Sequence, residues 1–127
     1  MRIRVRDMAN SADEFKKRTK AFAVRVMKLV DSLPQQTSAQ VIGKQLFRAA
    51  SSVAANYRAA CRGRSKAEFI AKLGIVEEEA DECGFWIEML IEGGFVPEAM
   101  LKPLLNEAGE ITAMIVASIR TMKGSKH

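Results

Sequence analysis

The feature that most constrains the fold of this chain is a stripe of apolar residues between positions 69 and 90. Its members follow one another at alternating intervals of four and three residues: Phe69, Leu73, Val76, Ala80, Cys83, Ile87 and Leu90. Such intervals place every member on one face of an α-helix, whereas a half-buried strand would alternate at every second residue. Because an amphipathic helix has to bury its apolar face, the stripe predicts packing against other helices.

Three further segments carry apolar stripes with helical spacing. The first consists of Phe15, Phe22, Val26, Leu29 and Leu33. The next consists of Ile42, Leu46, Ala50, Val53, Tyr57 and Ala60. The last consists of Leu101, Leu105, Ala108, Ile111, Ile115, Ile119 and Met122. Connections of only three or four residues make neighbouring helices antiparallel, so the sequence predicts one all-α domain over residues 1–127, an up-down-up-down four-helix bundle.

The expected helix starts are marked by capping boxes and by a proline. In a capping box a Ser or Thr oxygen accepts from the amide three residues on, and a Glu or Gln side chain reaches back. The chain offers three such pairs, Ser11 with Glu14, Thr37 with Gln40, and Ser65 with Glu68. The fourth start is marked by Pro97, which suits a first helical turn, and by Glu98, which meets the positive end of the helix dipole.

The expected helix ends are marked by residues that stop helices, Pro34, Gly63, the pair Gly93 and Gly94, and Gly124. Starts and stops together predict helices near 12–33, 38–62, 66–92 and 97–123, an N-terminal arm over 1–10 and a tail over 124–127. Pro103 predicts either a kink or a separate first turn in the last helix. The alternation from Arg2 to Arg6 fits an extended arm or an extra strand.

Composition excludes several classes of protein. The chain is 48% hydrophobic and 28% charged, as in soluble globular domains, and no apolar run approaches the roughly 18 residues of a membrane span. The N-terminus lacks the apolar region of an export signal, so we expect a cytoplasmic protein with no membrane partner. Cys61 and Cys83 fall inside helical patterns and the only histidine is His127, so we expect no metal site and no cofactor.

Charge is distributed unevenly, and the basic half suggests a binding surface. Residues 1–72 hold 16 basic against 5 acidic residues, whereas residues 73–127 hold 4 against 10. Clustered cations bind phosphates and release counterions, so a mainly electrostatic RNA or DNA site is one interpretation. Its candidate residues are Lys44, Arg48, Arg58, Arg62, Arg64 and Lys66. The alternative is that the two halves neutralise each other within the fold or between subunits.

An acidic run on the third helix bears on both alternatives. It comprises Glu77, Glu78, Glu79, Asp81 and Glu82. Bundles that bind two iron ions pair such acids with a histidine three residues on, and this run has no such histidine, so it does not predict a di-iron site. We interpret the acids as partners of Arg48 and Arg58 on the antiparallel second helix.

Four large apolar residues lie off the stripes, Phe47, Phe85, Trp86 and Met89. A helix with a second apolar face usually packs against something beyond its own bundle, so these residues predict self-association. The alternative is a wide core face in a compact monomer.

Short motifs give the chain a resemblance to a known family. They are the segment from Ser52 to Asn56, then Ser65, Lys66, Glu68 and Phe69 before the acidic helix, and the turn from Ser32 to Pro34. They resemble the bacterial four-helix-bundle proteins encoded in intervening sequences of 23S ribosomal RNA genes, which are similar in fold to accessory proteins of diversity-generating retroelements. Where many members read Asn-Ile-Ala-Glu-Gly, this chain reads Asn-Tyr-Arg-Ala-Ala over residues 56–60, so a role tied to that Glu is not carried over.

The resemblance implies a left-handed bundle that assembles as a homopentameric barrel, a nucleic-acid-binding role and no established enzyme activity. One catalytic alternative concerns Arg120 and His127, whose spacing resembles the signature of helical HEPN ribonucleases. Gly124 ends the helix between them, so the pair is not held in place and we expect no catalytic residues. The expected function is that of a non-catalytic, oligomeric nucleic-acid-binding accessory protein, with an oligomeric adaptor for another protein as the alternative.

Overall fold

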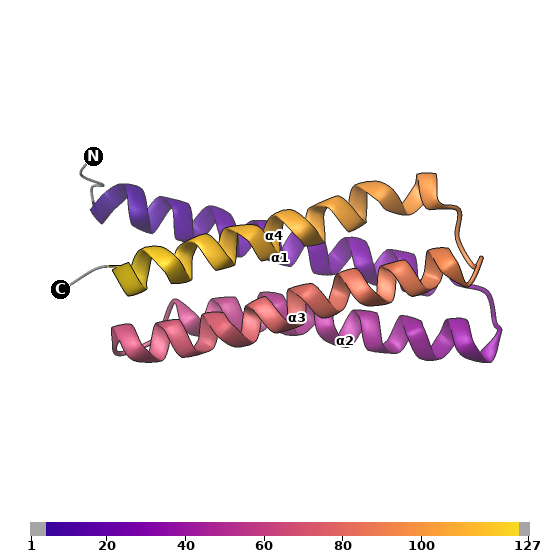
Figure 1. Ribbon diagram of the computed structural model, residues 1–127, viewed down its shortest axis with the longest axis horizontal. Coiled ribbons are helices and arrows are strands. Elements are labelled where there is room, and N and C mark those ends of the chain that lie inside the picture. The colour runs from indigo at the N-terminus through magenta and orange to yellow at the C-terminus, as the bar shows by residue number, and fades with distance from the viewer. Residues whose placement is uncertain (1–4, 125–127) are drawn as a thin grey trace.

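The computed structural model describes the backbone of residues 5–124 and the side chains of residues 11–124. Within that range the chain forms four α-helices and no strand: α1 (Val5–Asp31), α2 (Thr37–Ala60), α3 (Lys66–Glu92) and α4 (Glu98–Gly124). The helices pack side by side in one bundle, and successive helices run in opposite directions along its long axis (Figure 1). The all-α class and the four-helix bundle are therefore as the stripes predicted.

The first helix starts earlier than the capping signal suggested. Because α1 begins at Val5, Ser11 lies inside the helix and the prediction that Ser11 and Glu14 cap it is wrong. Residues 5–10 hold neither Gly nor Pro, so nothing local stops the helix from extending toward the N-terminus. The expected arm over 1–10 is therefore wrong for residues 5–10. For the segment from Arg2 to Arg6, Val5 and Arg6 are helical, and residues 2–4 lie outside the described part.

The two remaining capping boxes have different outcomes. At the start of α2, Gln36 occupies the N-cap position without a side-chain cap, and Gln40 Nε2 donates instead to the carbonyl of Pro34 at 2.8 Å. The predicted capping box of Thr37 and Gln40 is therefore wrong. At the start of α3 the Ser65 hydroxyl accepts from the Glu68 amide at 3.1 Å, as predicted. The Glu68 carboxylate accepts from the amide of Arg64, at 3.4 Å, rather than from that of Ser65.

The last helix starts at Glu98, one residue after the expected start at Pro97, which lies just before the helix. Pro103 lies inside α4, which remains one continuous helix, so the separate first turn is not formed. Between α3 and α4 the chain turns through Gly94, whose φ of +73° favours glycine.

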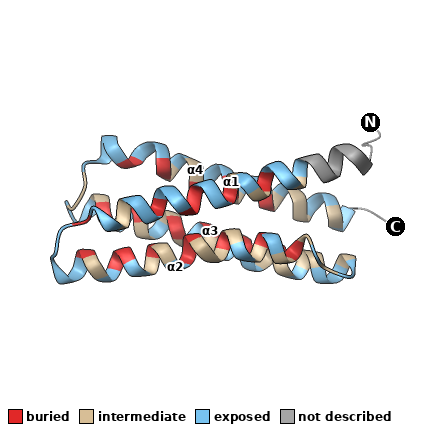
Figure 2. Cartoon of the chain, turned by 180° about the vertical axis from the view of Figure 1, so that it is seen from behind, coloured by how far each residue is buried: buried red, intermediate tan, exposed pale blue. Residues whose placement is uncertain are grey.

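The core lies along the bundle axis where the four stripes meet (Figure 2). All six stripe residues of α2 are buried, and on α3 only Phe69 is partly exposed. Two details differ from the sequence pattern. Thr19 is a buried polar residue of α1 whose hydroxyl donates to the Lys16 carbonyl at 3.1 Å, and Leu104 is buried more fully than Leu105.

Helices α1 and α2 approach closely because Gly43 faces α1. A Cβ at that position would lie 2.9 Å from Leu33 Cδ1 and 3.1 Å from Val30 Cγ1. Among the helices of the described segment, none is long and apolar enough to cross a membrane.

Candidate nucleic-acid interface

The candidate cations fall into two groups along α2 and the α2–α3 connection. Lys44 and Arg48 lie in the first half of α2, whereas Arg58, Arg62, Arg64 and Lys66 lie around its C-terminal end. At about 1.5 Å per residue, the helical rise places Lys44 and Arg58, the first and last of these positions on α2, roughly 21 Å apart. The residues therefore do not form one compact site. We call Arg62 and Arg64, which are exposed at the end of α2, the hairpin patch.

Arg48 is engaged by carboxylates of α3. Its guanidinium lies 2.6 Å from Glu82 Oε1 and 3.4 Å from Glu79 Oε2. Burial opposes ionisation of Glu82, but the hydrogen bonds from Arg48 and from the Trp86 indole outweigh it and lower the pKa of Glu82. The predicted pairing of the acidic run with Arg48 is thus confirmed, and the charge of Arg48 is balanced within the chain.

Arg58 behaves differently from Arg48. It forms no ion pair among residues 11–124, so the expected pairing with the acids of α3 is wrong. Ten residues at about 100° each place Arg58 about 80° around α2 from Arg48. That rotation turns Arg58 toward α1.

The structure places Arg58 in a groove between α1 and α2. The groove has a volume of about 610 Å³, and one end is lined by Lys16, Lys17, Lys20 and Arg58. The only acid in its lining is Asp13, which lies 3.0 Å from the Lys16 ammonium. The other end is apolar and is formed by Val24, Met27 and Phe47. The sequence places these lysines in the basic half of the chain, and the antiparallel pairing of α1 with α2 brings them to Arg58.

The hairpin patch keeps its charge exposed. Arg62 and Arg64 are exposed, and neither side chain has an acidic partner in the part of the chain that the structure describes. Ser65 fixes the local backbone by capping α3, so the two side chains project from an ordered connection. The hairpin patch is therefore a part of the predicted site that remains available to an anion, as are Lys44 and Arg58, which are exposed and have no ion pair in the described part of the chain.

The four apolar residues assigned to an interface lie on two separate faces. Phe85 and Met89 are exposed on α3, at 51% and 39%. Phe47 instead lines the α1–α2 groove, and Trp86 is half-buried, with its ring edge-on to that of Phe85 at 4.9 Å between centroids. Because Phe85 and Met89 are exposed, the alternative of a wide core face is wrong for these two residues.

Helices α1 and α4 are joined by an ion cluster that the sequence did not reveal. Arg18 donates through Nε and Nη2 to both carboxylate oxygens of Glu107, at 2.8 and 2.7 Å, and lies 3.6 Å from Glu110. The hydrogen bonds from Arg18 lower the pKa of Glu107. A spacing of 89 residues separates Arg18 from Glu107, so no local motif could have indicated the pair.

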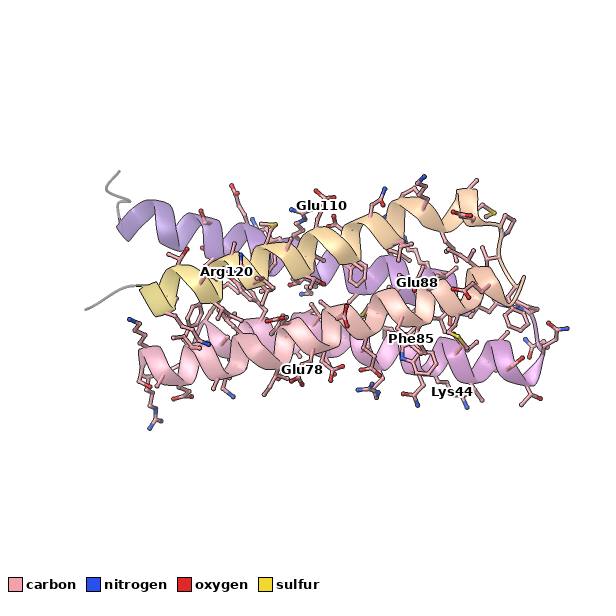
Figure 3. All side chains as sticks on the ribbon, viewed as in Figure 1. Lys44, Glu78, Phe85, Glu88, Glu110 and Arg120 are labelled. Carbon is pink, nitrogen blue, oxygen red and sulfur yellow. The ribbon has the colours of Figure 1, made fainter. Side chains whose placement is uncertain are left out.

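The remaining candidate chemistry is limited. Burial, with nearby Glu79 and Glu82, raises the pKa of Cys83 to about 12, so its thiol stays protonated near neutral pH. Residues 11–124 hold no group of three or more His, Cys, Asp or Glu side chains placed to bind a metal ion. Arg120 is exposed on α4 (Figure 3), and His127, its predicted partner, lies outside the described residues.

Comparisons with a family model and with solved structures agree. The chain is similar to a protein of unknown function from the S23 ribosomal protein family of Bacteroides thetaiotaomicron, whose crystal structure was determined at 1.70 Å. The two are 31% identical with a TM-score of 0.80, and the match covers 86% of this chain and 97% of that chain. A comparison with curated proteins finds no match. The sequence pattern of the 23S rRNA-intervening sequence protein family matches residues 13–117, and the chain belongs to that family.

Proposed function

We propose that the chain is a non-catalytic subunit of a homo-oligomer that binds RNA or DNA through the hairpin patch. The observation that carries the proposal is the contrast between Arg48 and the hairpin patch. Arg48 is neutralised by two carboxylates, whereas the side chains of Arg62 and Arg64 have no acidic partner among the described residues. An exposed, unneutralised pair of guanidinium groups can bind phosphate oxygens bidentately.

RNA is the first ligand to test. The names of the matching family and of the similar crystal structure refer to 23S ribosomal RNA and to a ribosomal protein family. Binding through phosphates alone depends on salt and discriminates little between sequences. We therefore expect affinity for structured RNA and duplex DNA that falls steeply as salt rises.

The experiment is a fluorescence anisotropy titration of a structured RNA and of a DNA duplex at low salt. The double variant Arg62→Ala with Arg64→Ala should bind both about tenfold more weakly, because each substitution removes a phosphate contact. The matched control is Lys102→Ala with Arg120→Ala, which removes the same charge from exposed positions on α4. Absence of binding by the wild-type protein, or equal weakening by the control, contradicts the proposal.

Self-association is supported by the exposed Phe85 and Met89, because apolar side chains of this size gather at contact surfaces. A left-handed bundle and a ring of five subunits are what the family resemblance implies for this assembly. The second candidate function, an adaptor for another protein, rests on the same exposed residues. An assembly that persists in solution while neither RNA nor DNA binds would favour the adaptor.

The non-catalytic role is supported by two side chains that could otherwise act as nucleophiles. Cys83 is buried with a raised pKa, and burial also raises the pKa of Tyr57, whose ring packs edge-on against Phe15 at 4.7 Å between centroids. Incubation of a labelled 23S rRNA fragment with the protein should leave its length unchanged. Cleavage that His127→Ala abolishes would contradict this part of the proposal.

A further inference from the structure

Helix α3 carries a second stripe at heptad spacing on the side away from its core stripe. Its members follow at intervals of three and four residues: Ile75, Glu78, Glu82, Phe85 and Met89. The three apolar members are all exposed. We call this set the outer stripe; Figure 3 labels two of its members, Glu78 and Phe85. A stripe of this spacing is the pattern by which one helix packs against others. Its middle member, Glu82, is paired with Arg48 of the same chain, whereas its three apolar members are left exposed by the described part of the chain.

The α1–α2 groove has the complementary character. Its α1 wall follows the same spacing through Lys17, Lys20, Val24 and Met27, with cations toward one end and apolar side chains toward the other. Between the walls, Ser51, Ala54 and Ala55 are small, so a helix could approach the floor closely. The outer stripe is acidic at Glu78 and apolar at Phe85 and Met89, whereas the groove is basic at Lys20 and apolar at Met27.

The two surfaces also match in height along the bundle. Arg48 pairs with Glu79 and Glu82, so this part of α2 is level with the middle of the outer stripe. Its neighbour Phe47 lines the groove together with Val24 and Met27, which places the apolar end of the groove at the same level.

Helices α1 and α3 run in the same direction (Figure 1). A second copy rotated about an axis parallel to the bundle therefore brings its Phe85 to Met27 and its Glu78 to Lys20.

We infer that the outer stripe of α3 in one copy of the chain docks into the α1–α2 groove of a second copy. This inference rests on the self-association proposed above and specifies its surfaces. The two surfaces differ, so the contact is heterologous: every copy offers one groove and one stripe, and the assembly closes as a ring or extends as a filament. Lys20 of the groove is then paired with Glu78 of the neighbour, and the hairpin patch is left to the nucleic acid.

The test is the solution mass of single-face variants, measured by light scattering after size-exclusion chromatography. Met27→Glu damages the groove and Phe85→Glu damages the outer stripe; both residues are exposed, so the fold is retained, which circular dichroism checks. Each variant alone should run as a single chain. Mixed in equal amounts they should form a complex of two chains and no larger one, because the intact stripe of one fits the intact groove of the other.

A charge exchange tests the polar half of the contact. Lys20→Glu and Glu78→Lys should each reduce the mass of the assembly, and the double variant should restore it. The control Met100→Glu, at an exposed position of α4 outside both surfaces, should keep the wild-type mass.

Three results would overturn the inference. The first is a wild-type protein that is a single chain in solution. The second is a change of mass in only one of the two single-face variants. The third is a Met27→Glu variant that keeps the wild-type mass but loses nucleic-acid binding. The last result would make nucleic acid the occupant of the groove. Loss of all nucleic-acid binding with the expected masses would instead refute the binding proposal and leave the docking contact standing.

Discussion

The two capping boxes of α2 and α3 give a sharp prediction, because they look alike in sequence and differ in structure. Only the Ser65 hydroxyl accepts a backbone hydrogen bond, from the Glu68 amide at 3.1 Å; the α2 start has no side-chain cap. Removing a formed N-cap costs about 1 kcal/mol. Ser65→Ala should therefore destabilise the protein by about that amount, or roughly 4 °C in Tm for a domain of this size.

Thr37→Ala is the matched control. Its hydroxyl caps nothing, and alanine is a better helix former than threonine by up to about 0.7 kcal/mol. The variant should be neutral or slightly stabilising, so the two variants should differ by about 1 to 1.5 kcal/mol.

Urea unfolding followed by circular dichroism measures this difference. Both variants are compared at one protein concentration, because self-association makes apparent stability depend on concentration. An unchanged m-value confirms that the shift in midpoint reports stability. Equal destabilisation by Thr37→Ala, or no effect of Ser65→Ala, would refute the assignment of the caps.

Two further predictions concern packing and charge. Gly43→Ala should be neutral or cost up to about 2 kcal/mol in urea unfolding, because crowding of its Cβ against Leu33 Cδ1, at 2.9 Å, costs about 1 to 3 kcal/mol and the gain in helix propensity offsets about 1 kcal/mol of that. Gly109→Ala, where a Cβ meets nothing within 4 Å, should stabilise the protein by about 0.5 to 1 kcal/mol. A Gly43→Ala variant that is more stable than the Gly109→Ala variant would contradict the close approach of α1 to α2. The pKa of Glu107 is lowered in the folded protein, so the contribution of Arg18 is present above the ordinary value of 4.5 and is lost as pH falls through the folded value. Arg18→Ala should thus lower the urea midpoint near neutral pH, and the decrease should be much smaller at a pH far below 4.5. An equal decrease of the midpoint at both pH values would show that packing, not charge, accounts for the contribution of Arg18.

The fold was largely predictable because its signals are periodic. The stripe from Phe69 to Leu90 alternates strictly, and six of its seven residues are buried. The failures came from signals that are not periodic. Ser-x-x-Glu at Ser11 lies inside α1, because no Gly or Pro stops the helix before it. The capping box at Thr37 depends on backbone angles at Gln36 that the sequence does not state.

The candidate site was less predictable because it depends on which way a helix faces. Arg48 and Arg58 have the same chemistry, yet about 80° of rotation turns one toward the acids of α3 and the other toward α1. The same reasoning separates Phe47 from Phe85, which sequence reasoning had assigned to one interface. Contacts such as Arg18 with Glu107 join residues 89 apart and follow only from the assembled bundle.

The central claim is that the hairpin patch binds phosphates, and the salt dependence of RNA affinity tests it most directly. The slope of log affinity against log salt falls by about 0.7 to 0.9 for each phosphate that the protein no longer neutralises, so Arg62→Ala with Arg64→Ala should reduce it by roughly 1.4 to 1.8. The Lys102→Ala, Arg120→Ala control should keep the wild-type slope. An unchanged slope in the hairpin-patch variant, or no measurable wild-type affinity at low salt, would contradict the claim.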